Sequence, residues 1–320
     1  MDKRSPEVEL VIRNRSKELG PMRPTGVAAW DDVIAVTDVL RHSVRVFSAL
    51  DGSLVREYGH GLLKFPYAVG VLDNKLYCAD AGRSRIVVFA RDTGALLFSL
   101  EREFSNPTAL AIDHRRRQLL VADTNRHRIQ VLSSDGAPLL EFGRCGDRCG
   151  ELYAPSGVAV LADGRIVVAD SSNDRVQVFS SNGEFLYTLL HAFYRPRGVW
   201  VDHQDRILVA DMAHNSIVAF ASDGTYLDSY GKGRGYFQLP FAVTSDAQGR
   251  VIVADTSHGC VQVIGAARWL PEMWRPELHA LASEDVKRVV LVVTMVRSLE
   301  HTAAISLLPN ELLFEIFSWL

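Results

Sequence analysis

The sequence predicts an all-β fold, a six-bladed β-propeller, and three observations lead to this fold class. An aspartate that closes an apolar strand recurs six times, at intervals of 42, 43, 47, 41 and 44 residues. A proline stands 14 to 16 residues before each of these aspartates, and each unit holds four short apolar segments separated by polar turns. A repeat of about 40 residues with four strands is typical of a propeller blade. The aspartates are Asp38, Asp80, Asp123, Asp170, Asp211 and Asp255, and the prolines are Pro24, Pro66, Pro107, Pro155, Pro196 and Pro240.

The fourth unit shows how the strands of one blade follow from the residues. Its expected strands are residues 157–160, 165–169, 175–179 and 184–189. Asp163-Gly164 and Asn182-Gly183 separate two pairs of these strands, and both dipeptides supply the positive φ angles of tight hairpins. The second strand of several units, as in IVVA, ILVA and VIVA, is apolar on both faces. Such a strand must be covered on both sides, and packing between two neighbouring blades would cover it.

The sixth unit lacks a fourth strand after its third one. We expect its strands near residues 241–245, 250–254 and 260–264, after which the sequence becomes Gly-Ala-Ala-Arg-Trp-Leu-Pro. The segment Glu9-Leu10-Val11-Ile12-Arg13 precedes the first proline and is strand-like. We therefore expect the N-terminal strand to complete the last blade, which would pair edges that are otherwise exposed. The propeller domain is predicted to span residues 1–268.

Three units share a longer pattern around the closing aspartate. They read ADAGRSRIVVF, ADTNRHRIQVL and ADSSNDRVQVF, and they resemble the NHL repeat, whose pattern is close to V-A-D-x-x-N-x-R-I-Q-V-F. The resemblance covers roughly residues 8 to 266. The pattern's arginine is present as Arg85, Arg128 and Arg175, and is replaced by Ser43, Ser216 and Cys260 in the first, fifth and sixth units. Because the aspartate and the arginine stand at the two ends of one hairpin loop, we expect them to form a structural ion pair or hydrogen bond.

Composition and charge place the chain among ordinary globular proteins. Hydrophobic residues make up 48% and charged residues 23%, and a formal net charge of -3 gives no overall attraction to nucleic acid or acidic lipid. The charged opening, MDKRSPEVEL, predicts no secretory signal, and the longest apolar run, Val289 to Val296, is too short to cross a bilayer. Four cysteines in 320 residues do not form a disulfide framework. We expect a reduced intracellular protein, cytoplasmic or nuclear, with no membrane contact.

The loops before each proline and after each aspartate should share one face of the propeller, which we call the top face. Apart from the repeat aspartates, these loops carry 13 basic and 6 acidic side chains. The candidate ligand-binding residues are Arg23, Tyr67, Arg83, Arg126, Arg144, Arg195, Arg197, Arg234 and Tyr236. Such a face suits an acidic protein partner. Some NHL propellers bind single-stranded RNA there, so the resemblance implies RNA as an alternative, with Tyr67, Tyr194, Tyr236 and Phe237 available for stacking on bases. A solvated rim without a ligand is the remaining interpretation.

An enzyme is the third possibility, because some six-bladed propellers are hydrolases or lyases with metal ligands around the central channel. The innermost strands expected here contain no Asp, Glu or His. Amidating lyases with NHL-like repeats place histidines directly after the strand-opening prolines, where this chain has Thr25, Tyr67, Thr108, Ser156, Arg197 and Phe241. We therefore expect no catalytic residue, no metal and no cofactor.

Two further motifs are interpreted as structural. Asp113-His114 and Asp202-His203 are expected in hairpin turns rather than in a catalytic dyad. Cys145 and Cys149 could form a disulfide or half of a metal site, but two free thiols are the favoured interpretation because no second cysteine pair is present.

The residues after the propeller have a different character. We expect a connector and helix over residues 269–300 and an amphipathic helix over 301–320, with Ser283 as a helix cap. The end of the chain resembles the start of an F-box, which binds the adaptor of cullin ubiquitin ligases. The residues that the resemblance implies for adaptor docking are Leu308, Pro309, Leu312, Leu313, Ile316 and Phe317. The same apolar stripe could instead pack on the propeller or bind another partner in a helix-in-groove mode.

These features together predict a protein-interaction scaffold. Its propeller would capture a ligand on the top face, and its C-terminal helical segment would dock a second protein. The most specific form of this prediction is a substrate receptor of a ubiquitin ligase.

Overall fold

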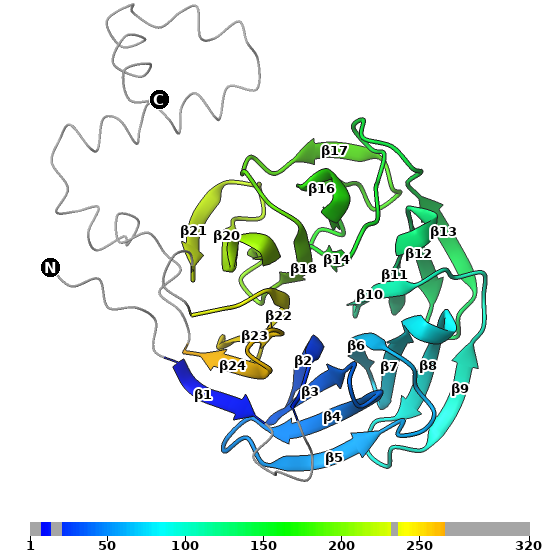
Figure 1. Cartoon of the computed structure of the whole chain (residues 1–320). Coiled ribbons are helices and arrows are strands. Elements are labelled where there is room, and N and C mark those ends of the chain that lie inside the picture. The colour runs from blue at the N-terminus through cyan, green and yellow to red at the C-terminus, as the bar shows by residue number, and fades with distance from the viewer. Residues whose placement is uncertain (1–7, 14–20, 232–235, 266–320) are drawn as a thin grey trace, which may run out of the picture. The chain divides into compact units, whose positions relative to one another are not determined.

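The computed structural model describes residues 8–13, 21–231 and 236–265. These residues form six four-stranded sheets that are arranged in a ring (Figure 1). Each sheet corresponds to one unit of the sequence repeat, so the predicted six-bladed propeller is confirmed. The described residues all belong to one compact unit, residues 1–269. The predicted boundary at residue 268 and the helices predicted after it lie outside the described residues.

The first three blades follow the chain in order. Blade 1 comprises β2 (Pro24–Trp30), β3 (Val33–Asp38), β4 (Ser43–Ser48) and β5 (Leu54–Tyr58). Blade 2 comprises β6 (Pro66–Leu72), β7 (Lys75–Asp80), β8 (Arg85–Ala90) and β9 (Leu96–Leu100). Blade 3 comprises β10 (Pro107–Asp113), β11 (Gln118–Asp123), β12 (Arg128–Ser133) and β13 (Pro138–Phe142).

The last three blades repeat this order until the final strand. Blade 4 comprises β14 (Gly157–Val160), β15 (Ile166–Asp170), β16 (Arg175–Phe179) and β17 (Phe185–Thr188). Blade 5 comprises β18 (Pro196–Val201), β19 (Ile207–Asp211), β20 (Ser216–Phe220) and β21 (Tyr226–Tyr230). Blade 6 comprises β22 (Pro240–Ser245), β23 (Val251–Asp255), β24 (Cys260–Ile264) and β1 (Val8–Arg13). Short 3₁₀ turns follow four of the aspartates: η2 (Ala81–Arg83), η3 (Thr124–Arg126), η4 (Ser171–Asn173) and η5 (Met212–His214).

The N-terminal strand closes the ring, as the sequence predicts. β1 pairs antiparallel with β24, with Leu10 opposite Val263 and Ile12 opposite Val261 (Figure 1). Ile12 is 1% exposed and packs with residues of blades 6 and 1. Closure therefore adds an apolar contact to the backbone hydrogen bonds of the outer edge.

The hydrophobic core is divided among the six joints between neighbouring blades. Each of six clusters of buried residues draws its members from two adjacent blades, such as blades 4 and 5 or blades 6 and 1. The second strands are buried throughout; all five residues of β15 and of β19 are buried. This arrangement explains why the sequence of these strands is apolar on both faces. Near the channel the blades come close together: a Cβ added to Gly198 would lie 2.7 Å from the Cα of Ala242 in the next blade.

A repeated hydrogen bond also links successive blades on the top face. The residue four positions after each repeat aspartate has a positive φ. In five blades the side chain of this residue accepts a hydrogen bond from the next blade. The donor is the backbone N–H of the residue that precedes the next blade's opening proline. In one example, the N–H of Ala154 donates to Nδ1 of His127 at 3.0 Å. The joint from blade 6 to blade 1 has Gly259 at this position, which has no side chain to accept such a bond.

Candidate ligand-binding face

The repeat aspartates are structural residues of the top face. All six are 0% exposed, and Oδ1 of each accepts a backbone N–H from the loop before its own proline at 2.6 to 3.1 Å. In blade 4 the donor is the N–H of Tyr153, which lies 2.6 Å from Oδ1 of Asp170. Each aspartate therefore fixes the loop that enters its own blade.

The second carboxylate oxygen lies within ion-pair distance of a basic side chain in every blade, and in blade 1 this contact is an ion pair without a hydrogen bond. The arginines of the repeat supply the basic side chain where they are present: Nε of Arg85, Arg128 and Arg175 lies 2.9, 3.0 and 2.8 Å from its aspartate. The three blades without that arginine use other residues: Arg45 with Asp38 at 3.8 Å, His214 with Asp211 at 2.8 Å and His258 with Asp255 at 2.7 Å. The structural interpretation of this pair is confirmed, and the buried aspartates do not offer their charge to a ligand.

The predicted arginines of the top face fall into two groups. Arg126 and Arg144 form ion pairs with Glu103 and Glu151, each at 2.9 Å. The side chains of Arg23, Arg83, Arg195 and Arg197 form no ion pair with any residue that the structure describes. Arg234 lies outside the described residues. Among the described candidate arginines, the positive charge available to a ligand is therefore that of the four without an ion pair: Arg23, Arg83, Arg195 and Arg197.

Exposed apolar side chains surround the same face, and most of them were missed by the sequence reasoning. Five top-face side chains are between 40% and 53% exposed: Leu40, Phe65, Tyr153, Tyr194 and Leu239. Only Tyr194 was among the aromatic candidates. Four of the five stand one or two residues before a strand-opening proline, and this position is the signal that could have identified them. The exposed rings of Phe65 and Tyr153 lie 4.7 and 5.2 Å from those of His42 and His127.

One aromatic candidate, Phe237, is buried and does not have the predicted role. Phe237 is 2% exposed and packs edge-on against Tyr230 in the core between blades 5 and 6, so it is not a stacking platform. Tyr236 stacks on the same Tyr230, with ring centroids 5.3 Å apart. The position of an aromatic residue in a predicted loop does not by itself show whether its ring is exposed or buried.

Tyr67 and Arg197 meet at the mouth of the channel, together with Phe241. The guanidinium carbon of Arg197 lies 4.9 Å from the ring centroid of Phe241, and the rings of Tyr67 and Phe241 are 5.7 Å apart. Burial lowers the pKa of the Arg197 guanidinium, and the nearby positive charge of Arg195 acts in the same direction. These residues come from blades 5, 2 and 6, so the mouth cluster depends on closure of the ring.

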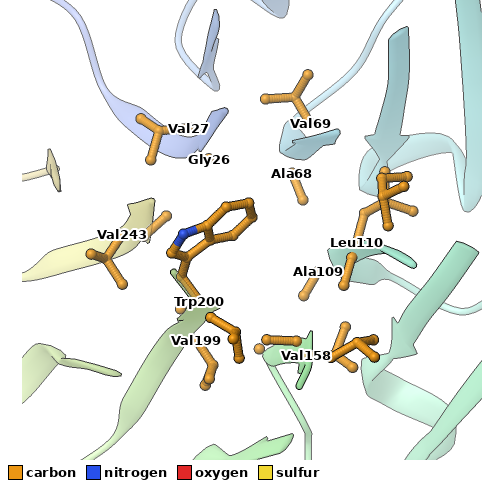
Figure 2. Close-up of a pocket in the computed structure, with 18 of the residues that line it drawn as sticks. Gly26, Val27, Ala68, Val69, Ala109, Leu110, Val158, Val199, Trp200 and Val243 are labelled. Carbon is orange, nitrogen blue, oxygen red and sulfur yellow. The ribbon is translucent and has the colours of Figure 1, made fainter. Parts of the chain in front are cut away.

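The channel is a cavity of about 460 Å³ lined by the innermost strands of the six blades and, at one end, by turn residues that include His114, Asp202 and His203. Figure 2 shows Val27, Val69, Val158 and Val243 around it, with the indole of Trp200 extending into the opening. Trp200 belongs to β18, and its Nε1–H donates to Oγ of Ser245 in blade 6 at 2.9 Å. The apolar residues of the strands agree with the sequence prediction, but β10 ends on Asp113, which lines the cavity, so the expected absence of Asp from the innermost strands is wrong there. The position of Trp200 inside the channel was not foreseen.

The polar residues at the opposite end of the channel stabilise turns. Oδ1 of Asp113 accepts the N–H groups of Arg115 and Arg116, and Oδ1 of Asp202 accepts those of Gln204 and Arg206. The aspartates of both Asp-His pairs thus have the structural role that was predicted.

Among the described residues, no three His, Cys, Asp or Glu side chains gather as a metal site would require. All four cysteines are free, with Cys145 and Cys149 exposed and the other two buried. No helix within the described ranges is long and apolar enough to span a membrane.

Comparison with known proteins bears on the repeat and on the fold. The family model described as "NHL repeat" matches residues 104–132 and 152–179, in blades 3 and 4. The chain carries NHL repeats. A segment of 62 residues is 39% identical to "Protein brain tumor" of Drosophila melanogaster, and it covers 19% of this chain and 6% of that protein. The matched segment is therefore a small part of the longer protein.

Solved structures with low sequence identity share the architecture of these NHL repeats. Virginiamycin B lyase from Staphylococcus aureus has a TM-score of 0.57 at 14% identity, with 81% of this chain and 88% of that chain covered. A streptogramin B lyase has a TM-score of 0.60 at 14% identity, with 80% and 96% covered. A chain of a nidogen/laminin complex has a TM-score of 0.55 at 19% identity, with 65% and 80% covered. Likeness at these identities shows the fold alone.

Proposed function

We propose that this NHL propeller is a non-catalytic scaffold that captures a protein partner on its top face. The supporting observation is the composition of that face, where exposed apolar side chains such as Phe65, Tyr153 and Tyr194 alternate with arginines that have no ion pair in the described structure. Aromatic residues and arginine are the side chains enriched at interface hot spots. The propeller holds these side chains on loops that the buried aspartates fix, so little order would be lost on binding.

Affinity purification of the full chain tests this proposal. Tyr194→Ala combined with Tyr153→Ala should weaken partner binding by about thirtyfold or more, since truncation of a single aromatic hot spot costs about 2 kcal/mol. Leu139→Ala is the matched control, because Leu139 is 51% exposed on the outer edge of blade 3, away from the top face. If the outer-edge variant loses the same partners and the tyrosine variant keeps them, the top face is not the capture surface.

The C-terminal segment is the proposed second docking element. Its resemblance to the start of an F-box supports a role for Leu308, Pro309, Leu312, Leu313, Ile316 and Phe317 in binding a cullin-ligase adaptor. Leu313→Asp should abolish co-purification of the adaptor, whereas Glu315→Ala, off the apolar stripe, should not. Recovery of the same partners after truncation at residue 268 would rule out this docking role.

RNA is the second candidate ligand of the top face. Tyr194 is 52% exposed, stands beside Arg195, and lies with its ring 6.0 Å from that of His214. Aromatic rings next to cations are what single-stranded RNA binding requires. Filter binding of RNA that weakens steeply with salt would favour this candidate. Binding of protein partners that persists after ribonuclease treatment would favour the first.

A further inference from the structure

The central channel has the properties of a small-molecule site. Its volume of about 460 Å³ lies within the range of roughly 300 to 1,000 Å³ that ligand pockets occupy. The labelled wall residues are apolar, including Ala68, Ala109, Val158 and Val199 (Figure 2), and the charged lining residues, such as Asp113 and Asp202, belong to the end of the channel opposite the top face. The hydroxyls nearest the top do not compete for a ligand, because Thr25 and Ser156 each bond to the proline carbonyl of the next blade.

Arg197 stands at the mouth of this channel with an unmet bonding requirement. Its Nε is buried and has no hydrogen-bond acceptor in the described part of the chain. Its planar group rests on Phe241, a wall residue of the cavity, and no described carboxylate pairs with it. An unpaired buried donor is costly, and more so when it carries charge. This Nε is closed to solvent, whereas the terminal nitrogens of the same guanidinium are not among the buried unpaired atoms, so a ligand would reach the charge through them.

We propose that the channel mouth binds a small amphiphile, whose oxyanion head pairs with the guanidinium of Arg197 and whose apolar chain enters the channel. The head would be a carboxylate or a phosphate monoester, since both present an oxygen that matches a guanidinium. Arg195, two residues away, adds a second positive charge near the same point. Arg195 and Arg197 also belong to the top face, but this inference concerns the channel and does not depend on protein capture.

The position of Trp200 sets the length of the chain and provides a signal. Arg197 and Trp200 are three residues apart on β18, which corresponds to about 10 Å along a strand. An extended unbranched chain of about eight carbons has a similar length. Its end would reach the indole of Trp200, which extends into the opening (Figure 2).

Binding of octanoate, octyl phosphate and octanol to the full chain, followed by tryptophan fluorescence, tests the proposal. Octanoate or octyl phosphate should bind at least about tenfold more tightly than octanol, the increment expected for one charge-assisted hydrogen bond. The fluorescence change should disappear in Trp200→Phe, while calorimetry still detects binding. Equal affinity for the anions and the alcohol, or no binding of any of the three, would overturn the proposal.

Variants of two arginines test the role of the guanidinium. Arg197→Met should bind octanol as the unchanged chain does but lose the preference for the anions. Arg148→Met is the matched control, because Arg148 is an exposed top-face cation in the loop between blades 3 and 4. A preference for anions that survives in Arg197→Met would contradict the assignment. If Arg197→Met does not fold, the comparison of anions with octanol on the unchanged chain still decides the question.

Discussion

Each repeat aspartate concentrates several hydrogen bonds on one buried carboxylate. Asp170 accepts the N–H of Tyr153 on one oxygen, and Asn173, Arg175 and Gln177 donate to the other. The carboxylate joins the incoming loop, the 3₁₀ turn and two strands of one blade. The sequence places the aspartate and the arginine at the ends of one loop, and their pairing could therefore be predicted. The bond to the incoming loop could not, because it joins residues 17 positions apart.

Asp170→Ala should therefore destabilise the protein by about 3 kcal/mol, the usual cost of breaking a buried ion pair and leaving its partners unsatisfied. Equilibrium unfolding in guanidinium chloride measures this loss. Asp147→Ala is the control, because Asp147 is exposed and its side chain has no partner in the described structure; it should change the free energy of unfolding by less than about 0.5 kcal/mol. A change as small as the control's would mean that the carboxylate is not a structural centre.

The four thiols should differ in reactivity, because only a thiolate is alkylated. Burial raises the pKa of Cys260 to about 11 and raises that of Cys78 well above its ordinary value. At pH 8 both remain almost entirely protonated, whereas Cys145 and Cys149 are exposed. Iodoacetamide followed by mass spectrometry should modify the exposed pair first and the buried pair only after denaturant is added. Early modification of Cys78 would show that blade 2 is less tightly packed than the structure indicates.

At the scale of the element, the strand that closes the ring has most influence on the propeller. β1 is far from the rest of blade 6 in sequence, so its contribution must come from pairing with β24 and from Ile12. Such closure could be predicted, because the sixth unit lacks a strand and the N-terminus supplies one. The observed strands agree with the predicted ones to within about one residue, since apolar alternation and Asp-Gly or Asn-Gly turns define them locally.

Ile12→Ala should cost about 3 kcal/mol, because it removes a buried side chain from the cluster shared by blades 6 and 1. Thermal unfolding should show a lower midpoint, and removal of residues 1–15 should lower it further and expose the edge of β24. Val55→Ala, on an outer-edge strand where the side chain is 55% exposed, should leave the midpoint almost unchanged. A truncated chain that melts like the full one would show that β1 does not hold the ring closed.

At the scale of the whole molecule, the fold was predictable and the mouth of the channel was not. Six repetitions of one signal identify the propeller even where single units depart from the pattern. The mouth cluster brings together Tyr67, Arg197 and Phe241 from three blades, and no local pattern indicates which side chains meet across a ring. The position of Trp200 inside the channel is equally a consequence of closure.

Closure also makes one joint of the ring different from the other five. The side chain that links successive blades is replaced by Gly259 at the joint from blade 6 to blade 1, and the outer strand of blade 6 is held by pairing without a direct chain connection. The contacts between blades 6 and 1 include the hydrogen bond that the Thr256 hydroxyl donates to the carbonyl of Pro24 at 2.6 Å. They also include the apolar cluster that contains Ile12. Local opening occurs where the fewest contacts resist it. Hydrogen exchange followed by mass spectrometry should therefore find that the amides of β1 and β24 exchange before those of β17 and β16, the equivalent strands of a continuous blade. Equal protection in blades 4 and 6 would show that strand pairing alone makes the last joint as strong as the others.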